Sequence, residues 1–410
     1  MTGTTGMTGT TSMRRTVPLY LAGVLVSGFG TTALWLVSGI WVKSLTGSDG
    51  LAALTAFALW APALCGPVLG ALADRVRRRP LIVAVNLAMA ALLPVLLWVD
   101  SADRVWLLFA VLVVYGAQGA VQDAAESALA AGTLDERRLG DFNGLRLTAN
   151  EATKLVAPMA AAGLFARWGA GPVVLLDAAT FALAGGLFAL MRVREEPPRP
   201  QGRVPGRWRA ETAEGLRVLR GAPLPRLLVP AAAFTMLLAG LNGAAVYAVV
   251  DGGLGHDPAY AGVLYTVQGA GSVAAGLAAG PLLRRVSEAR LAAVGLALFA
   301  VAAGARALPY DGVALAASAG IGLGLPWVLV ATATAVQRTA PKEAVGRAAA
   351  TANTLVFVPN AVALALGAAL VELVDVRVLL PGLAVAGAAG AAALAAARRP
   401  SRARRDGAGA

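Results

Sequence analysis

Long apolar runs, each about as long as a membrane-spanning helix, alternate along this chain with short polar and basic segments. A helix that crosses a bilayer needs roughly 20 mainly apolar residues. Twelve such windows appear when the sequence is divided at its charges and turn residues: 19–42, 51–73, 81–99, 105–131, 144–166, 172–191, 226–249, 259–283, 290–308, 312–336, 347–371 and 378–397. The pattern predicts an all-α membrane protein with 12 transmembrane helices.

The composition leaves too little polar surface for a soluble globule. Of the 410 residues, 58% are hydrophobic and only 14% are charged, whereas ordinary soluble domains carry about 25% charged residues. The net charge of +12 would suit nucleic acid, but the basic residues stand in clusters between the apolar runs, so we expect no nucleic-acid partner. With one cysteine, Cys65, and one histidine, His256, we expect no metal centre, no disulfide and no cofactor.

The basic residues indicate the orientation of the chain. Of the 35 lysines and arginines, 29 fall on one side of the predicted spans, five fall on the other and Lys154 lies inside a span. Cytoplasmic loops of membrane proteins carry the excess of Lys and Arg. We therefore expect a multi-pass protein of the cell (inner or plasma) membrane with both termini in the cytoplasm.

Charge and low-complexity segments divide the chain into five parts. We expect a disordered cytoplasmic tail, a six-helix bundle, a cytoplasmic linker, a second six-helix bundle and a basic cytoplasmic tail, at residues 1–18, 19–191, 192–225, 226–397 and 398–410. The linker is charged and rich in proline, as is typical of segments without a core of their own. Within it, Trp208 to Arg220 form either an amphipathic helix on the membrane surface or part of a solvated linker.

The two predicted bundles resemble each other in sequence. The stretch 70–76 ends the second span and 280–286 ends the eighth, and they share Gly, Leu, Arg and Val in register. An Asn followed by a Pro also recurs in the fifth and eleventh spans. Two pseudo-repeat halves of this kind are typical of transporters that bind their substrate between the halves.

The loop after the second span carries a recognisable motif. Its residues Gly70, Leu72, Asp74, Arg75, Arg78 and Arg79 match the signature of the major facilitator superfamily, while Arg77 stands where that family often has Gly. The chain therefore resembles a member of that superfamily. The resemblance implies the 12-helix major facilitator fold and a cytoplasmic gate formed by Gly70, Asp74, Arg75, Arg78 and Arg79.

Two short sequence motifs are most similar to those of the exporter branch that contains enterobactin and macrolide efflux permeases. Thr46-Gly47-Ser48 and Leu176-Asp177-Ala178 stand where that branch has similar residues. The resemblance implies proton-coupled efflux of an amphiphilic small molecule, such as a drug, a siderophore or a secondary metabolite. One departure is Tyr115, which stands where drug–proton antiporters carry an Arg before Gln118-Gly119. A nutrient importer or facilitator of the same fold is the alternative, and a non-transporting membrane sensor or enzyme is a distant one.

Ionisable residues inside apolar spans are the first functional candidates, because a charge there costs about 2.5–3.5 kcal/mol on insertion scales. The fourth and fifth spans place six polar groups at similar depths: Gln118, Gln122, Asp123, Glu126, Glu151 and Lys154. We expect this cluster to bind protons or substrate during transport. The alternatives are a structural salt bridge between the two spans and carboxylates hydrated at the cytoplasmic mouth.

Asp177, at the start of the sixth span, is a separate case. Its oxygens are suited to accept hydrogen bonds from neighbouring helices, and we favour that structural role. For the whole chain we expect a monomer in the lipid bilayer, with a small-molecule substrate and protons as its partners.

Overall fold

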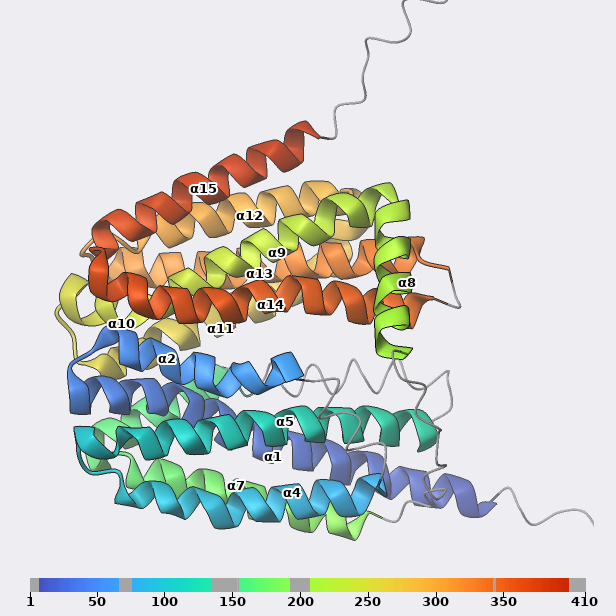
Figure 1. Ribbon diagram of the computed structural model, residues 1–410, viewed down its shortest axis with the longest axis vertical. Coiled ribbons are helices and arrows are strands. Elements are labelled where there is room, and N and C mark those ends of the chain that lie inside the picture. The colour runs from blue at the N-terminus through green and yellow to red at the C-terminus, as the bar shows by residue number, and fades with distance from the viewer. Residues whose placement is uncertain are drawn as a thin grey trace, which may run out of the picture. The chain divides into compact units, whose positions relative to one another are not determined.

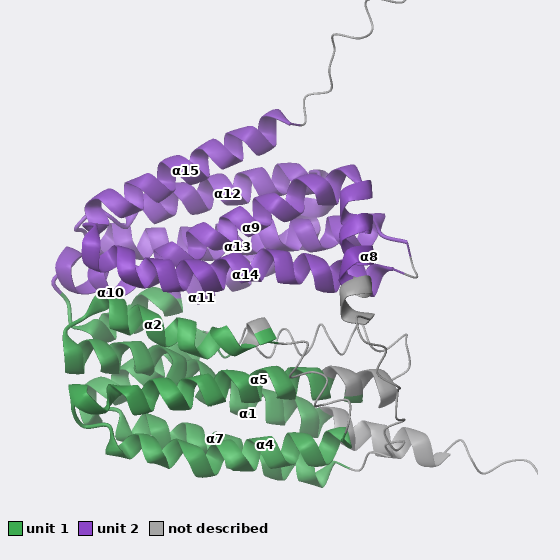
Figure 2. Ribbon diagram, viewed as in Figure 1, with its two compact units in different colours: residues 1–204, 256–266 green, residues 205–255, 267–410 purple. Residues whose placement is uncertain are grey.

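The computed structural model describes residues 7–65, 76–133, 153, 155–191, 207–341 and 344–397. These ranges form helices joined by short turns, and no strand occurs within them (Figure 1). Nine of the described helices are long and apolar enough to cross a membrane. The chain divides into two compact units, shown in separate colours in Figure 2.

Unit 1 comprises residues 1–204 and 256–266. Its described elements are α1 (Met7–Thr46), α2 (Asp49–Trp60), η1 (Ala61–Cys65), α4 (Arg78–Leu92), η2 (Leu93–Trp98), η3 (Ala102–Arg104), α5 (Val105–Thr133), the helix Leu155–Trp168, α7 (Gly171–Leu190) and η5 (Pro258–Tyr260). The segment 256–266, which includes the first residues of α11, belongs to this unit although it follows the linker in sequence.

Unit 2 comprises residues 205–255 and 267–410. Its described elements are α8 (Arg207–Gly221), α9 (Pro223–Ala244), α10 (Val246–Ala248), the π-helix η4 (Val249–Gly253), the greater part of α11 (Ala261–Arg285), α12 (Glu288–Ala305), α13 (Asp311–Thr339), α14 (Val345–Leu373) and α15 (Val376–Ala396). The predicted windows 290–308, 312–336, 347–371 and 378–397 each correspond to one helix, whereas the window 226–249 is divided among α9, α10 and the first residue of η4.

Every one of the twelve predicted windows contains a described helix. Nine meet the length and hydropathy expected of a span. The other three are α2, the helix Leu155–Trp168 and α11. The first two are short apolar helices: α2 continues into the 3₁₀ turn η1, and Leu155–Trp168 adjoins a residue outside the described ranges. The predicted fold class, an all-α membrane protein, is confirmed.

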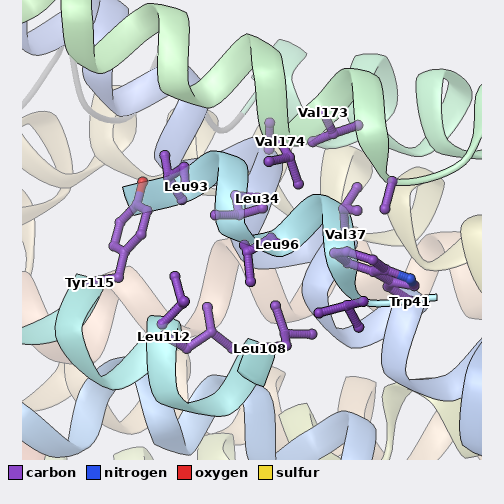
Figure 3. Close-up of a cluster of buried hydrophobic side chains, with 14 of the residues drawn as sticks. Leu34, Val37, Trp41, Leu93, Leu96, Leu108, Leu112, Tyr115, Val173 and Val174 are labelled. Atoms are coloured by element: carbon purple, nitrogen blue, oxygen red, sulfur yellow. The ribbon is translucent and has the colours of Figure 1, made fainter. Parts of the chain in front are cut away.

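Large apolar side chains from four elements fill the interior of unit 1. Figure 3 shows this core, which brings together Leu34, Val37 and Trp41 of α1, Leu93 and Leu96 of η2, Leu108, Leu112 and Tyr115 of α5, and Val173 and Val174 of α7. Other large apolar side chains point outward, such as Trp98 and Trp106 at 67% exposed each. Apolar side chains on both the inner and the outer faces are expected for helices that lie in lipid.

Small residues set the closest helix contacts at matching places in both units. A Cβ added to Gly116 of α5 would overlap with the backbone oxygen of Leu59 in α2. In unit 2 a Cβ on Gly322 of α13 would overlap with the backbone oxygen of Gln268 in α11. The first pair joins the second and fourth predicted spans, and the second pair joins the eighth and tenth. The two halves therefore share a glycine-mediated close helix contact as well as sequence motifs.

Part of the segment that we expected to be a linker is an ordered element of unit 2. Helix α8 spans Arg207–Gly221, which favours the amphipathic-helix alternative over a solvated linker there. Its Glu214 accepts a hydrogen bond from Arg347 of α14 at 2.8 Å. Gly215 lies so close to α14 that a Cβ would overlap with Thr351. Helix α8 is therefore held against α14 by one ion pair and one close backbone approach.

Candidate functional site

A ladder of polar side chains runs along one face of α5. Gln118, Gln122 and Glu126 are spaced four residues apart, which places them one above another on a helix. The amide nitrogen of Gln118 donates to Gln122 Oε1 at 2.6 Å. The amide nitrogen of Gln122 in turn donates to Glu126 Oε1 at 2.8 Å. The structure thus brings together three of the predicted site residues in one hydrogen-bonded row.

Two further helices contribute to the same row. Tyr20 of α1 donates its hydroxyl to Glu126 Oε2 at 2.6 Å. Asn86 of α4 donates to Gln122 Oε1 at 3.0 Å and to the Ile82 carbonyl at 2.7 Å. Both oxygens of Glu126 therefore accept hydrogen bonds. We call these five residues, Tyr20, Asn86, Gln118, Gln122 and Glu126, the amide ladder.

The amide ladder is largely closed to solvent. Glu126 is 3% exposed and Asn86 is 0% exposed. Asn86 Oδ1 has no hydrogen-bond partner within the described ranges. A buried carbonyl oxygen without a donor costs about 1–3 kcal/mol, so this atom offers a place for a water molecule or another donor to bind beside Gln122.

The other members of the predicted cluster are placed differently. Asp123 is exposed, because it lies one residue and thus about 100° around α5 from Gln122. Glu151 and Lys154 lie outside the described residues, so their part in the cluster, including the alternative of a salt bridge between the two spans, stays a prediction. Neither Tyr20 nor Asn86 was among our candidate site residues. A sequence gives no sign that side chains 106 residues apart, as Tyr20 and Glu126 are, will meet.

A second group of buried polar side chains lies around Asp177 of α7, next to Tyr115, which precedes Gln118 on α5. The hydroxyl of Tyr115 lies 3.0 Å from Asp177 Oδ2 and 2.9 Å from the hydroxyl of Thr31 in α1. The Thr31 hydroxyl lies 2.8 Å from the Ser27 carbonyl. Asp177 therefore has the interhelical partner that we expected for it, and that partner is the tyrosine that replaces the antiporter arginine.

The predicted cytoplasmic gate is only partly within the described residues. Gly70, Asp74 and Arg75 lie outside them. Arg79 donates from Nε to the Phe188 carbonyl at 3.2 Å and from Nη2 to the Ala189 carbonyl. These carbonyls end α7, where the helix dipole favours a cation. Arg79 thus caps a helix of its own unit, while Arg78 is half-buried at the first turn of α4.

Unit 2 has a different polar interior. Arg306, at 2% exposed, donates to the Ser318 hydroxyl at 2.8 Å and approaches Gln268 Oε1 at 3.4 Å. Asn242 Oδ1 is buried without a hydrogen-bond partner in the described part of α9 and its neighbours. The described acidic residues of unit 2 lie away from the middles of its spans: Glu211, Glu214, Asp251, Glu288, Asp311, Glu372 and Asp375. Among the described residues, acidic groups well inside spans are therefore those of unit 1. The described residues also hold no cluster of three or more potential metal ligands.

A family model described as Major Facilitator Superfamily matches residues 20–250 and 228–410. Macrolide efflux protein A of Streptococcus pyogenes is 26% identical over 202 residues, which is 48% of this chain and 50% of that protein. A second version of it, from Streptococcus pyogenes serotype M6, matches equally. The chain spans about half the length of the curated relatives that it matches.

Solved structures match over nearly the full chain. A crystal structure of the peptide transporter POT in complex with sulfate has a TM-score of 0.71 at 13% identity, covering 93% of each chain. A POT family transporter in complex with a thioalcohol-conjugated peptide reaches 0.73 at 11% identity, covering 93% of this chain and 95% of the other. A bacterial homologue of the human lysosomal transporter Spinster reaches 0.64 at 17% identity, covering 96% and 95%. Identities this low establish the fold alone.

Proposed function

Because the chain belongs to the major facilitator superfamily, which makes it a membrane transporter, we propose that it exports an amphiphilic small molecule in exchange for protons. The observation that carries this proposal is Glu126, a carboxylate inside a span whose two oxygens both accept hydrogen bonds. An ionisable side chain inside a span raises the free energy of membrane insertion, and such residues mark proton or substrate pathways.

Proton uptake at Glu126 changes its contacts in a defined way. Once protonated, one carboxyl oxygen becomes a donor, so either Gln122 or Tyr20 must change its role. The amide nitrogen of Gln122 can only donate, whereas the Tyr20 hydroxyl can also accept. The change therefore falls on Tyr20, and the contact between α1 and α5 senses whether Glu126 carries a proton.

The similarity to a macrolide efflux protein supports export as the direction of transport. The match covers half of that protein's length. A drug, a siderophore or a secondary metabolite fits the same proposal. An importer or facilitator of the same fold is the alternative, and the loop that contains Asp74 and Arg75 is proposed as the cytoplasmic gate in either case.

Substrate accumulation in cells tests the proposed direction. An efflux-deficient bacterial host that expresses the chain is expected to accumulate less of at least one amphiphile from a panel that includes a macrolide and ethidium. A protonophore should restore accumulation to the level of the empty host, because it removes the proton gradient that drives exchange. Greater accumulation in expressing cells would instead support import.

Reporter fusions test the proposed orientation. Asp49 follows the first span and Asp257 follows the seventh, and the excess of basic residues lies on the opposite side. A periplasmic reporter such as alkaline phosphatase should be active at both positions and inactive at the C-terminus. Activity of a cytoplasmic reporter at either aspartate would overturn the orientation.

A further inference from the structure

We propose that Asp177 is a second proton-binding site of this transporter, which takes up and releases its proton through the hydroxyls of Tyr115 and Thr31. The chemical class of its ligand is a single proton. Its carboxyl group is separate from that of Glu126, which comes 11 residues after Tyr115 on α5, about 16 Å along the helix axis, although Gln118 at the near end of the amide ladder comes only three residues after Tyr115. Its part in transport rests on the proposed function, but its proton binding does not.

Among the described residues, the hydrogen-bond partners of Asp177 are polar and none of them is a cation. Its side chain is 0% exposed. The described side chains within hydrogen-bonding distance of its carboxyl are Tyr115, at 3.0 Å, and Thr180, at 3.2 Å. Thr180 lies closer to the Asp177 backbone carbonyl, at 2.7 Å, and gives its one proton there. A carboxylate in a membrane span without a counter-charge is strongly disfavoured, so this arrangement fits a neutral carboxylic acid.

Charged side chains on the elements packed around Asp177 are distant or engaged elsewhere. On α1, Lys43 lies 12 residues beyond Thr31, about 18 Å along the axis, and pairs with Asp49 of α2 at 3.0 Å. On α4, Arg79 binds the carbonyl of Phe188, which is 11 residues from Asp177, and Arg78 precedes it. The other charged or titratable residues described on these elements are Arg14, Arg15 and Tyr20 in the first half of α1, with Arg15 16 residues before Thr31, and Tyr115, Asp123 and Glu126 on α5. No described cation therefore stabilises an anion at Asp177.

Within the described ranges, Tyr115 and Thr31 offer the proton of Asp177 a polar path toward α1. Gly30 lies against the other side of Asp177, where a Cβ would overlap with Oδ1 and with the Thr180 hydroxyl. Tyr115 lies at one side of the apolar core in Figure 3, and its ring packs edge-on to that of Phe181 with 5.3 Å between the ring centroids. From Oδ2 the row of oxygens continues through Tyr115 to Thr31, which is half-buried rather than fully enclosed.

The row can carry a proton in either direction with all bonds balanced. For uptake, the Tyr115 O–H bond breaks and its proton forms the new O–H bond on Asp177 Oδ2. Tyr115 then receives the Thr31 hydroxyl proton, and Thr31 receives one from a hydrated proton, which is left as water. The net change is one proton bound and one carboxylate neutralised. Release is the reverse, and rotation of the hydroxyls resets the row.

Infrared difference spectroscopy of the purified protein tests this proposal without any transport measurement. Between about pH 5 and about pH 9, a range that covers carboxyl groups in protein interiors, the wild type should lose a carboxylic C=O stretching band. Asp177→Asn should lack that band while leaving the bands of other carboxyl groups unchanged. In Tyr115→Phe the same band should shift in frequency, because its hydrogen-bond partner is gone.

Two adjacent threonines of α1, Thr31 and Thr32, allow a controlled test of the proposed proton path through Tyr115 and Thr31. Thr31 and Thr32 each bond a backbone carbonyl four residues earlier at 2.8 Å, but the Thr32 hydroxyl leads to Thr153 and away from Tyr115. Thr31→Val should slow hydrogen–deuterium exchange of the Asp177 carboxyl on the order of tenfold, the scale expected when one hydrogen bond is removed. Thr32→Val should leave that rate unchanged.

The outcomes separate this inference from the proposed function. A titrating band that is lost in Asp177→Asn supports the proton site even if no proton-coupled transport is found. A wild type without such a band overturns it, as does a band that neither titrates nor responds to Tyr115→Phe. If Asp177→Asn does not fold, Tyr115→Phe and the threonine pair decide the matter. Equal rates of hydrogen–deuterium exchange at the Asp177 carboxyl in the two threonine variants would overturn the proposed proton path through Thr31.

Discussion

Replacing Glu126 by glutamine is expected to abolish proton-driven transport while leaving substrate binding intact. The amide retains the size of the carboxyl group and can still bond to Tyr20, but it has no proton to exchange. Concentrative transport in vesicles should fall to the level of vesicles that lack the protein. Exchange of labelled for unlabelled substrate, which needs no net proton movement, should persist.

The matched control for this variant is Glu214→Gln. Glu214 is also a carboxylate, and it pairs with Arg347 at 2.8 Å between α8 and α14. Both partners are partly exposed, at 37% and 41%, so the pair contributes only about 0–1 kcal/mol to stability. Transport and its pH dependence should be nearly unchanged. Normal transport with unaltered pH dependence in Glu126→Gln would remove the proton role of the amide ladder.

Two glycine substitutions are expected to destabilise the protein strongly. A Cβ in Gly116→Ala would overlap with the Leu59 backbone oxygen, and one in Gly271→Ala would overlap with that of Ala319. Backbone atoms cannot move aside as a flexible side chain can, so each helix pair must separate. We expect each variant to lose about 1–3 kcal/mol of unfolding free energy, the usual cost of overpacking, or more.

Each of these glycines has a control on its own helix. Gly119 of α5 and Gly276 of α11 have no atoms within 4 Å of an added Cβ. Alanine there should leave the unfolding temperature unchanged or slightly raised, because alanine favours a helix over glycine. Thermal unfolding in detergent should separate the two pairs clearly. Equal unfolding temperatures for Gly116→Ala and Gly119→Ala would contradict the close contact between α2 and α5.

The sequence was sufficient to predict the spans because apolar length is a direct requirement of the bilayer. It did not predict where the α-helix gives way to a 3₁₀ turn: α2 has 12 residues and passes into η1 at Ala61, and residues 66–73 of the same apolar window lie outside the described ranges. It also did not predict that α8 packs against α14, since that contact depends on Gly215 and on a partner 133 residues from Glu214.

The candidate site was predictable along one helix but not across helices. The four-residue spacing of Gln118, Gln122 and Glu126 places them on one face from sequence alone. Tyr20 and Asn86 join them only through packing of α1 and α4. Tyr115 was noticed as a departure from an antiporter motif, but its partner Asp177 lies 62 residues away, so its contact required the structure.

The most direct test of proton-coupled export is transport into inverted membrane vesicles under an imposed pH gradient. The substrate is the amphiphile identified by the accumulation screen, and the gradient is acidic inside. The account predicts that wild-type vesicles concentrate the substrate, that an ionophore which dissipates the gradient stops this, and that Glu126→Gln vesicles only equilibrate it. Concentration that is independent of the gradient, or that proceeds equally in Glu126→Gln, would contradict it.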